Sequence, residues 1–99
     1  MLKYLTDITK EDYEQIEALA ALFFTPREIA VMLEMRVQDM NDEMMDEESA
    51  IYRAFNCGRL QSEADLRKSI VKLAKSGSSP AQTMSLDLLN KSKARMLDR

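Results

Sequence analysis

Six carboxylates crowd into one short segment and are the first candidates for chemistry. They lie between residues 39 and 48: Asp39, Asp42, Glu43, Asp46, Glu47 and Glu48. The spacing Asp39-x-Asn41-x-Glu43 follows the start of a calcium loop, but the loop's glycine at the sixth position is absent, and Ala50 stands where the bidentate Glu belongs. No polar partner for acid–base catalysis is implied either. We therefore predict neither a metal site nor a catalytic pair in this segment.

The rest of the composition also argues against catalysis. The chain has no His and a single cysteine, Cys57, among its 99 residues. Pairs of Ser or Cys with His and His-based zinc sites are excluded. One cysteine cannot form an intrachain disulfide, which fits a reducing compartment, and the small and apolar neighbours of Cys57 favour packing over reactivity. The sequence predicts a non-catalytic protein without a cofactor.

Basic residues in the C-terminal half form a candidate phosphate-binding row. Lys68, Lys72 and Lys75 are spaced i, i+4 and i+7, with Arg67 beside them. Lys and Arg side chains that neutralise phosphates supply most of the nonspecific affinity of proteins for DNA. The row is equally typical of the solvated face of an amphipathic helix, and it could instead pair with the acidic region of a neighbouring copy.

The net charge of −3 hides a strong division along the chain. Residues 1–50 carry four basic and thirteen acidic side chains, whereas residues 51–99 carry ten basic and four acidic ones. The first half therefore has a net charge of −9 and the second a net charge of +6. The basic half could fold onto the acidic half, or one copy could pair with the next, so self-assembly is an expectation from charge alone.

Helices must position these groups. Two Gly and two Pro are too few for the turns of a many-stranded barrel, and apolar residues recur at helical spacing. The pattern predicts helices over about 10–23, 25–33, 37–46, 48–75 and 80–96. We expect an all-α fold with an N-terminal trihelical, helix-turn-helix-like unit over residues 1–47 and a long-helix antiparallel hairpin over 48–99 that mediates oligomerisation. Gly58 lies inside the long helix, where it marks either a kink or a close helix contact.

The helix-turn-helix interpretation starts at Thr25. The segment from Thr25 to Leu33 has a capping Thr, a Pro at the first helical position and an apolar face, as in the first helix of that motif. The usual motif continues with a Gly in the turn and a Ser or Thr that opens the recognition helix, positions taken here by Glu34 and Arg36. The next helix offers Gln38 and Asn41 as base readers. Its carboxylates would repel DNA, so a trihelical core with a solvated acidic face is the alternative.

Two stretches together resemble a known family. Residues 25–33, followed by residues 58–82 with Gly77-Ser78-Ser79-Pro80-Ala81-Gln82 at their end, are similar to small phage or prophage proteins of the terminase small-subunit type. The resemblance implies a DNA-binding helical domain, a hairpin that assembles subunits into a ring, and recognition of viral DNA for packaging by the large ATPase subunit. It also implies residence in the cytoplasm of a bacterial host.

The residue assignments combine this resemblance with the charge and apolar patterns. The resemblance places Arg27 and residues 38–41 at DNA-facing positions. The candidate DNA-binding side chains are Arg27, Arg36, Gln38, Asn41, Arg67, Lys68, Lys72 and Lys75. The candidate packing side chains of the hairpin and oligomer are Ile51, Phe55, Leu66, Ile70, Leu73, Met84 and Leu88.

The sequence therefore predicts a non-catalytic, oligomeric adaptor for DNA binding or DNA packaging. Its expected partners are further copies of itself, double-stranded DNA and the terminase large subunit. A dimeric transcriptional regulator of the helix-turn-helix class and a protein–protein adaptor without nucleic-acid binding remain open. No stretch approaches the roughly 20 apolar residues of a membrane span, so we expect no membrane contact and a cytoplasmic location.

Overall fold

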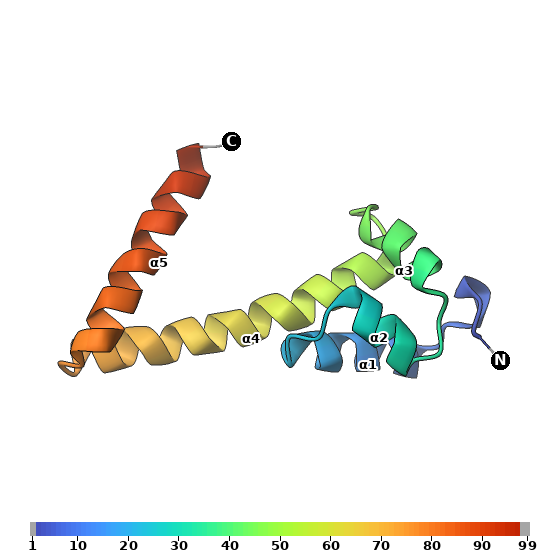
Figure 1. Cartoon of the computed structure of the whole chain (residues 1–99), viewed down its shortest axis with the longest axis horizontal. Helices are drawn as coiled ribbons and strands as arrows, with labels where there is room; N and C mark the ends of the chain where they lie inside the picture. Colours follow the sequence, from blue (N-terminus) through green and yellow to red (C-terminus); the bar gives the residue numbers. More distant parts are fainter. Residues whose placement is uncertain (1, 98–99) are drawn as a thin grey trace. The chain divides into compact units, whose positions relative to one another are not determined.

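The computed structural model describes residues 2–97 and is all-α there, as the composition predicts (Figure 1). The ends of the two predicted ranges, residue 1 and residues 98–99, lie outside the described residues. A short 3-10 helix precedes five α-helices: η1 (Leu5–Asp7), α1 (Lys10–Ala21), α2 (Pro26–Met32), α3 (Val37–Met44), α4 (Ala50–Lys75) and α5 (Ser79–Leu97). Each predicted helix is present, and no end differs from the prediction by more than two residues.

Threonine caps start the first two α-helices. The Thr9 hydroxyl accepts a hydrogen bond from the Asp12 backbone N–H at 3.2 Å, and the Asp12 carboxylate accepts from the Thr9 N–H at 2.9 Å. Thr25 and Glu28 make the same reciprocal pair at 3.2 and 2.8 Å. These are capping boxes, in which two otherwise unpaired backbone donors are satisfied. The start signals in the sequence are confirmed.

Left-handed residues end three of the helices. After α1, α2 and α4 the backbone turns at Phe23, Glu34 and Gly77, whose φ values are 68°, 57° and 101°. At the end of α2, Met35 N–H donates to Ala30 C=O at 2.8 Å and Glu34 N–H donates to Val31 C=O at 3.2 Å. This is the Schellman pattern, and it usually places Gly at the left-handed position. Glu34 therefore adopts the backbone conformation that the sequence pattern reserves for glycine.

The apolar core lies in the N-terminal of two compact units. The chain divides into Met1–Glu63 and Ala64–Arg99, so the boundary falls within α4. The largest fully buried side chains, Ile16, Ile29, Met40 and Ile51, come from α1, α2, α3 and the start of α4. Because the first turns of α4 complete this core, the unit extends to residue 63 and does not end at residue 47 as expected from the sequence.

Gly58 lies where α4 closely approaches α1. The helix runs without interruption from Ala50 to Lys75, so Gly58 does not end it. Gly58 is buried, and a Cβ built on it would overlap the Glu17 carbonyl oxygen of α1. Of the two alternatives for this glycine, the close helix contact is the one observed.

The N-terminal arm ties α1 to the turn between α2 and α3. Lys3 N–H donates to Glu34 C=O at 2.7 Å, and the Lys3 ammonium pairs with the Asp12 carboxylate at 2.8 Å. The Arg36 guanidinium stacks over the Tyr4 ring, 4.8 Å from its centroid. Asp12 is buried, and its pKa is lowered, first by the hydrogen bond from Lys3 and then by that from Thr9 N–H. The arm thus holds an ionised carboxylate at the edge of the core.

The left-handed turn predicts a stabilising substitution. Glu34→Gly should raise the free energy of unfolding by about 1 kcal/mol, because a non-glycine residue in this conformation is strained by roughly that amount. Glu34→Ala is the control, since it removes the same side chain and keeps the strain. Urea unfolding followed by circular dichroism measures both. Equal stability of the two variants would contradict this explanation.

Asp12 predicts a pH dependence of stability. Its folded-state pKa is lowered, so its contribution is complete above the unfolded-state value of about 3.9 and is lost as the pH falls through the folded value. The difference in unfolding free energy between the wild type and Asp12→Asn should therefore be largest above about pH 5 and shrink toward about pH 2. Urea unfolding across this range measures the difference. Asp39→Asn controls for the loss of one acidic group, and a difference independent of pH would contradict the prediction.

Candidate basic interface on the C-terminal hairpin

A short turn reverses the chain between α4 and α5. Gly77 takes the left-handed position, and Ser78 N–H donates to Leu73 C=O at 3.1 Å. On the far side Gln82 N–H donates to Ser78 C=O at 2.9 Å, and the Gln82 amide reaches back to Ala74 C=O at 3.1 Å. The segment from Gly77 to Gln82 is therefore a hydrogen-bonded hairpin turn.

The hairpin has almost no core of its own. In the side chains described for residues 64–96, Ala81 beside the turn is the one buried apolar residue. Within this unit the last turns of α4, from residue 64 onward, and α5 diverge from the turn (Figure 1). Large apolar side chains are exposed along both helices: Leu66, Val71, Leu73, Met84, Leu86, Leu89 and Met96. This much exposed apolar surface on a small unit is typical of an interaction site.

The seven predicted packing residues fall into two groups, two in the N-terminal core and five on the hairpin. Ile51 and Phe55 are buried in the N-terminal core and do not belong to the hairpin. Leu66, Leu73 and Met84 are 52, 55 and 54% exposed. The remaining two, Ile70 and Leu88, are half-buried. The hairpin residues thus form a surface within one chain, not a packed interior.

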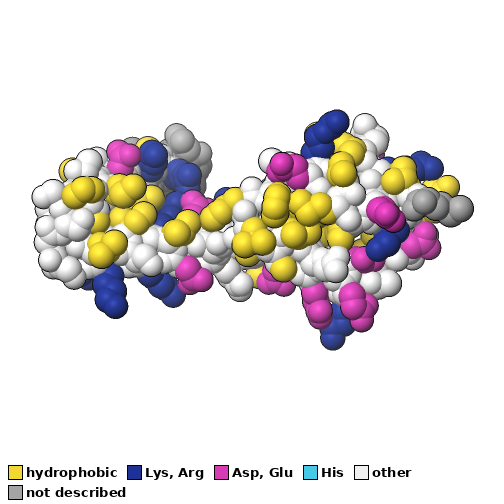
Figure 2. Space-filling view, turned by 60° about the horizontal axis from the view of Figure 1, so that its bottom comes forward, with side chains coloured by type: hydrophobic (Ala, Val, Ile, Leu, Met, Phe, Trp, Pro, Cys, Tyr) yellow, Lys and Arg dark blue, Asp and Glu magenta, His cyan; other side chains and the backbone are white. Residues whose placement is uncertain are grey.

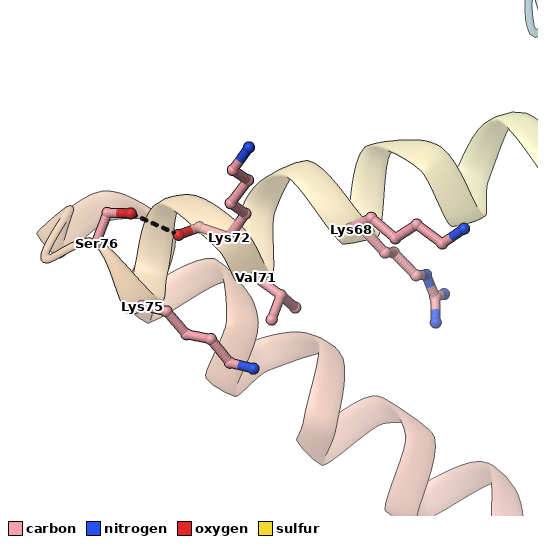
Figure 3. A pocket seen from close by; sticks show the side chains of 6 residues that line it. Lys68, Val71, Lys72, Lys75 and Ser76 are labelled. Atoms are coloured by element: carbon pink, nitrogen blue, oxygen red, sulfur yellow. Dashed lines mark hydrogen bonds between the residues drawn. The ribbon is translucent and has the colours of Figure 1, made fainter.

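A basic groove follows the last turns of α4. It is open, has a volume of about 590 Å³ and is lined by Arg67, Lys68, Val71, Lys72, Lys75 and Ser76. Figure 3 shows Val71 and Lys75 on the side of α4 that faces α5, whereas Lys72 extends from the opposite side. The Ser76 hydroxyl donates to the Lys72 C=O at 3.0 Å, which satisfies a carbonyl at the helix end (Figure 3). All four predicted basic residues of α4 line this groove, together with Val71 and Ser76, which the sequence did not single out.

The four predicted DNA-binding residues of the N-terminal unit have a different environment. Arg27, Arg36, Gln38 and Asn41 are exposed. The Arg36 guanidinium lies on the Tyr4 ring, and the Gln38 amide donates to the Asp42 carboxylate at 2.8 Å. To hydrogen-bond to a DNA base, the Gln38 side chain would have to break this hydrogen bond, and the base would then lie close to the negatively charged Asp42 carboxylate. The structure therefore places the predicted DNA-binding residues in two groups, one in each unit.

The two units carry opposite net charges. Residues 1–63 have six basic and fourteen acidic side chains, a net charge of −8. Residues 64–99 have eight basic and three acidic side chains, a net charge of +5. On the face in Figure 2, acidic side chains gather mostly over the N-terminal unit and basic ones over the hairpin. A polyanion would be attracted to the hairpin and repelled by the other unit.

Cys57 is exposed, contrary to the packing role expected from its neighbours in the sequence. Its thiol donates to the Glu17 carboxylate at 3.2 Å, and this hydrogen bond raises the pKa of Cys57. A raised pKa leaves less of the reactive thiolate.

The part of the chain that the structure describes holds no group of three or more His, Cys, Asp or Glu that could bind a metal ion. Within residues 2–97 no helix is both long enough and apolar enough to cross a bilayer. Comparison of the chain with protein-family models, curated proteins and solved structures finds no match. The features that point to a function are therefore the exposed apolar side chains of the hairpin and its basic groove.

Proposed function

We propose that the chain is a non-catalytic DNA-binding protein that assembles from several copies and acts as an adaptor in DNA packaging. One observation carries the proposal: the hairpin combines exposed leucines and methionines with a groove of four basic side chains. The apolar surface serves assembly, and the basic groove serves contact with phosphates.

Apolar burial supports the assembly. Exposed leucines are costly in water, and fully burying one such side chain contributes about 1.5–3 kcal/mol. The described residues of the hairpin offer them no cover except at the turn near Ala81. A second copy presents the same surface, and most soluble oligomers are built from identical chains.

Charge and accessibility support the DNA contact. Lys68, Lys72 and Lys75 are exposed, and together with Arg67 they line a groove in the unit of positive net charge. Phosphate contacts of this kind give affinity with little sequence preference. The acidic surroundings of Gln38 disfavour base reading by α3, so we assign DNA contact first to the hairpin.

The packaging role rests on the resemblance of residues 25–33 and 58–82 to terminase small subunits. Such a protein assembles on DNA and presents it to a large ATPase subunit. The left-handed turn at Glu34, between α2 and α3, is compatible with the helix-turn-helix interpretation of this region. The expected partners are further copies, double-stranded DNA and the terminase large subunit.

Reversing two lysines tests the DNA contact. Lys68→Glu/Lys72→Glu should weaken binding to duplex DNA and lower the slope of log affinity against log salt by about two, because each phosphate contact contributes about 0.9 to that slope. Fluorescence anisotropy with labelled duplex at several salt concentrations measures the slope. Lys10→Glu/Arg53→Glu changes the charge equally on exposed residues of the N-terminal unit and serves as the control. An unchanged slope in the hairpin variant would remove the groove as the DNA contact.

Replacing two exposed leucines tests the assembly. Leu66→Gln/Leu73→Gln should leave the monomer's helicity unchanged but raise the dissociation constant of the assembly more than about 100-fold, since each leucine loses about 2 kcal/mol of burial. Sedimentation velocity over a dilution series measures it. Leu22→Gln/Val31→Gln is the control, because these side chains are 68 and 64% exposed on the N-terminal unit. A wild-type protein that stays monomeric would contradict the proposal, and a dimer selective for one DNA sequence would favour a transcriptional regulator.

A further inference from the structure

We propose that the basic groove of one copy binds the acidic end of α3 in a second copy. This acidic end comprises the last turn of α3 and the residues that follow it: Asp42, Met45, Asp46, Glu47 and Glu48. The contact joins two different surfaces of the same chain, so its repetition links copies head to tail.

The groove determines what kind of segment fits it. Its exposed basic side chains, Lys68, Lys72 and Lys75, favour negative charge, and Val71, which is 38% exposed, offers an apolar contact beside them. Figure 3 shows Val71 and Lys75 on the same side of α4. A complementary segment therefore carries several carboxylates and one protruding apolar side chain.

The acidic end of α3 has this composition. Met45 is 87% exposed, and five carboxylates lie within three residues of it in the sequence, four of them exposed. Methionine is flexible and polarizable, which suits it to an irregular apolar contact. The N-terminal unit thus presents an exposed methionine that carboxylates flank in the sequence.

The helix end adds an independent reason for a basic partner. The C-terminus of a helix carries partial negative charge, which basic side chains in the last turn normally offset. The last turn of α3 has no basic residue, whereas the last turn of α4 has Lys72 and Lys75. Cations supplied by another chain would relieve the repulsion between the carboxylates and the end of α3.

The net charges favour a second copy as the occupant. The acidic end belongs to a unit of charge −8, and the groove belongs to a unit of charge +5. Two copies aligned head to tail bring these opposite charges together, whereas two grooves face to face would repel. A contact between unlike surfaces generates a ring or a filament, depending on its rotation.

One consequence concerns DNA and rests on the proposed function. Lys68 and Lys72 cannot hold carboxylates and phosphates at the same time. The acidic end of α3 therefore competes with DNA for the groove, and removing its charge should strengthen DNA binding.

Reciprocal charge reversal tests the contact. The groove variant is Lys68→Glu/Lys72→Glu, and the α3 variant is Asp42→Lys/Glu47→Lys; all four side chains are exposed. Each variant alone places like charges across the contact. When the two are mixed, each groove again meets an α3 end of opposite charge. The control Glu11→Lys/Glu14→Lys changes the charge as the α3 variant does, on exposed residues of α1.

Fluorescence titration of labelled groove variant at low salt measures the pairing, after circular dichroism has shown that all variants are helical. We expect self-association of each single variant to be weaker than wild type by at least about tenfold, and the mixture of groove and α3 variants to recover wild-type affinity. The control variant alone should associate with wild-type affinity, because its groove and its α3 end are both unchanged. Unchanged association of the single variants, no recovery in their mixture, or an equally weakened association of the control would overturn the proposal.

DNA binding separates this inference from the proposed function. The α3 variant should bind duplex DNA more tightly than the control variant of equal charge, by about tenfold or more at low salt. Equal affinities would overturn the competition. A wild-type protein that binds no DNA would refute the proposed function, while recovery in the mixing experiment would still establish the head-to-tail contact.

Discussion

The contact between Gly58 and the backbone of α1 at Glu17 sets the limit of the apolar core. Up to this point α4 packs against the N-terminal helices and buries Ile51 and Phe55. Past it, α4 continues as a helix whose large apolar side chains, such as Leu66, are exposed. The first turns of α4 therefore belong to the apolar core, whereas its last turns expose their apolar side chains to solvent.

Because of that division, the two units differ in charge and in exposed apolar surface, and these two properties indicate the function. The N-terminal unit has an apolar core of its own and is acidic. Two of its basic groups already have partners: Lys3 forms an ion pair with Asp12, and Arg36 lies over the Tyr4 ring. The hairpin is basic, and Ala81 is the one buried apolar residue among its described side chains. Exposed apolar surface favours association with other copies, while positive charge favours a polyanion, so both requirements meet on the same pair of helices.

Local signals in the sequence predicted the helices well. They did not predict which helices pack against each other, because those contacts join segments that are distant in the sequence. The capping residues at Thr25 and Glu28 act through neighbouring backbone groups, so their pattern is readable from the sequence. The apolar periodicity of α4 showed that Ile51 is buried but not that its partners are α1 to α3. Likewise the left-handed Glu34 depends on the surrounding helices, which override its local preference. The sequence did not predict that Val71 lines the groove, although it lies three residues after Lys68 on the helix.

The central claim is that other copies of the chain cover the hairpin, and amide hydrogen exchange measured at several protein concentrations tests it most directly. We expect protection in residues 64–97 to rise with concentration, because assembly buries the exposed faces of α4 and α5 and suppresses their local opening. Protection in the core segments around Ile16 and Ile29 should stay nearly constant. Exchange in the hairpin that does not depend on concentration would contradict the account.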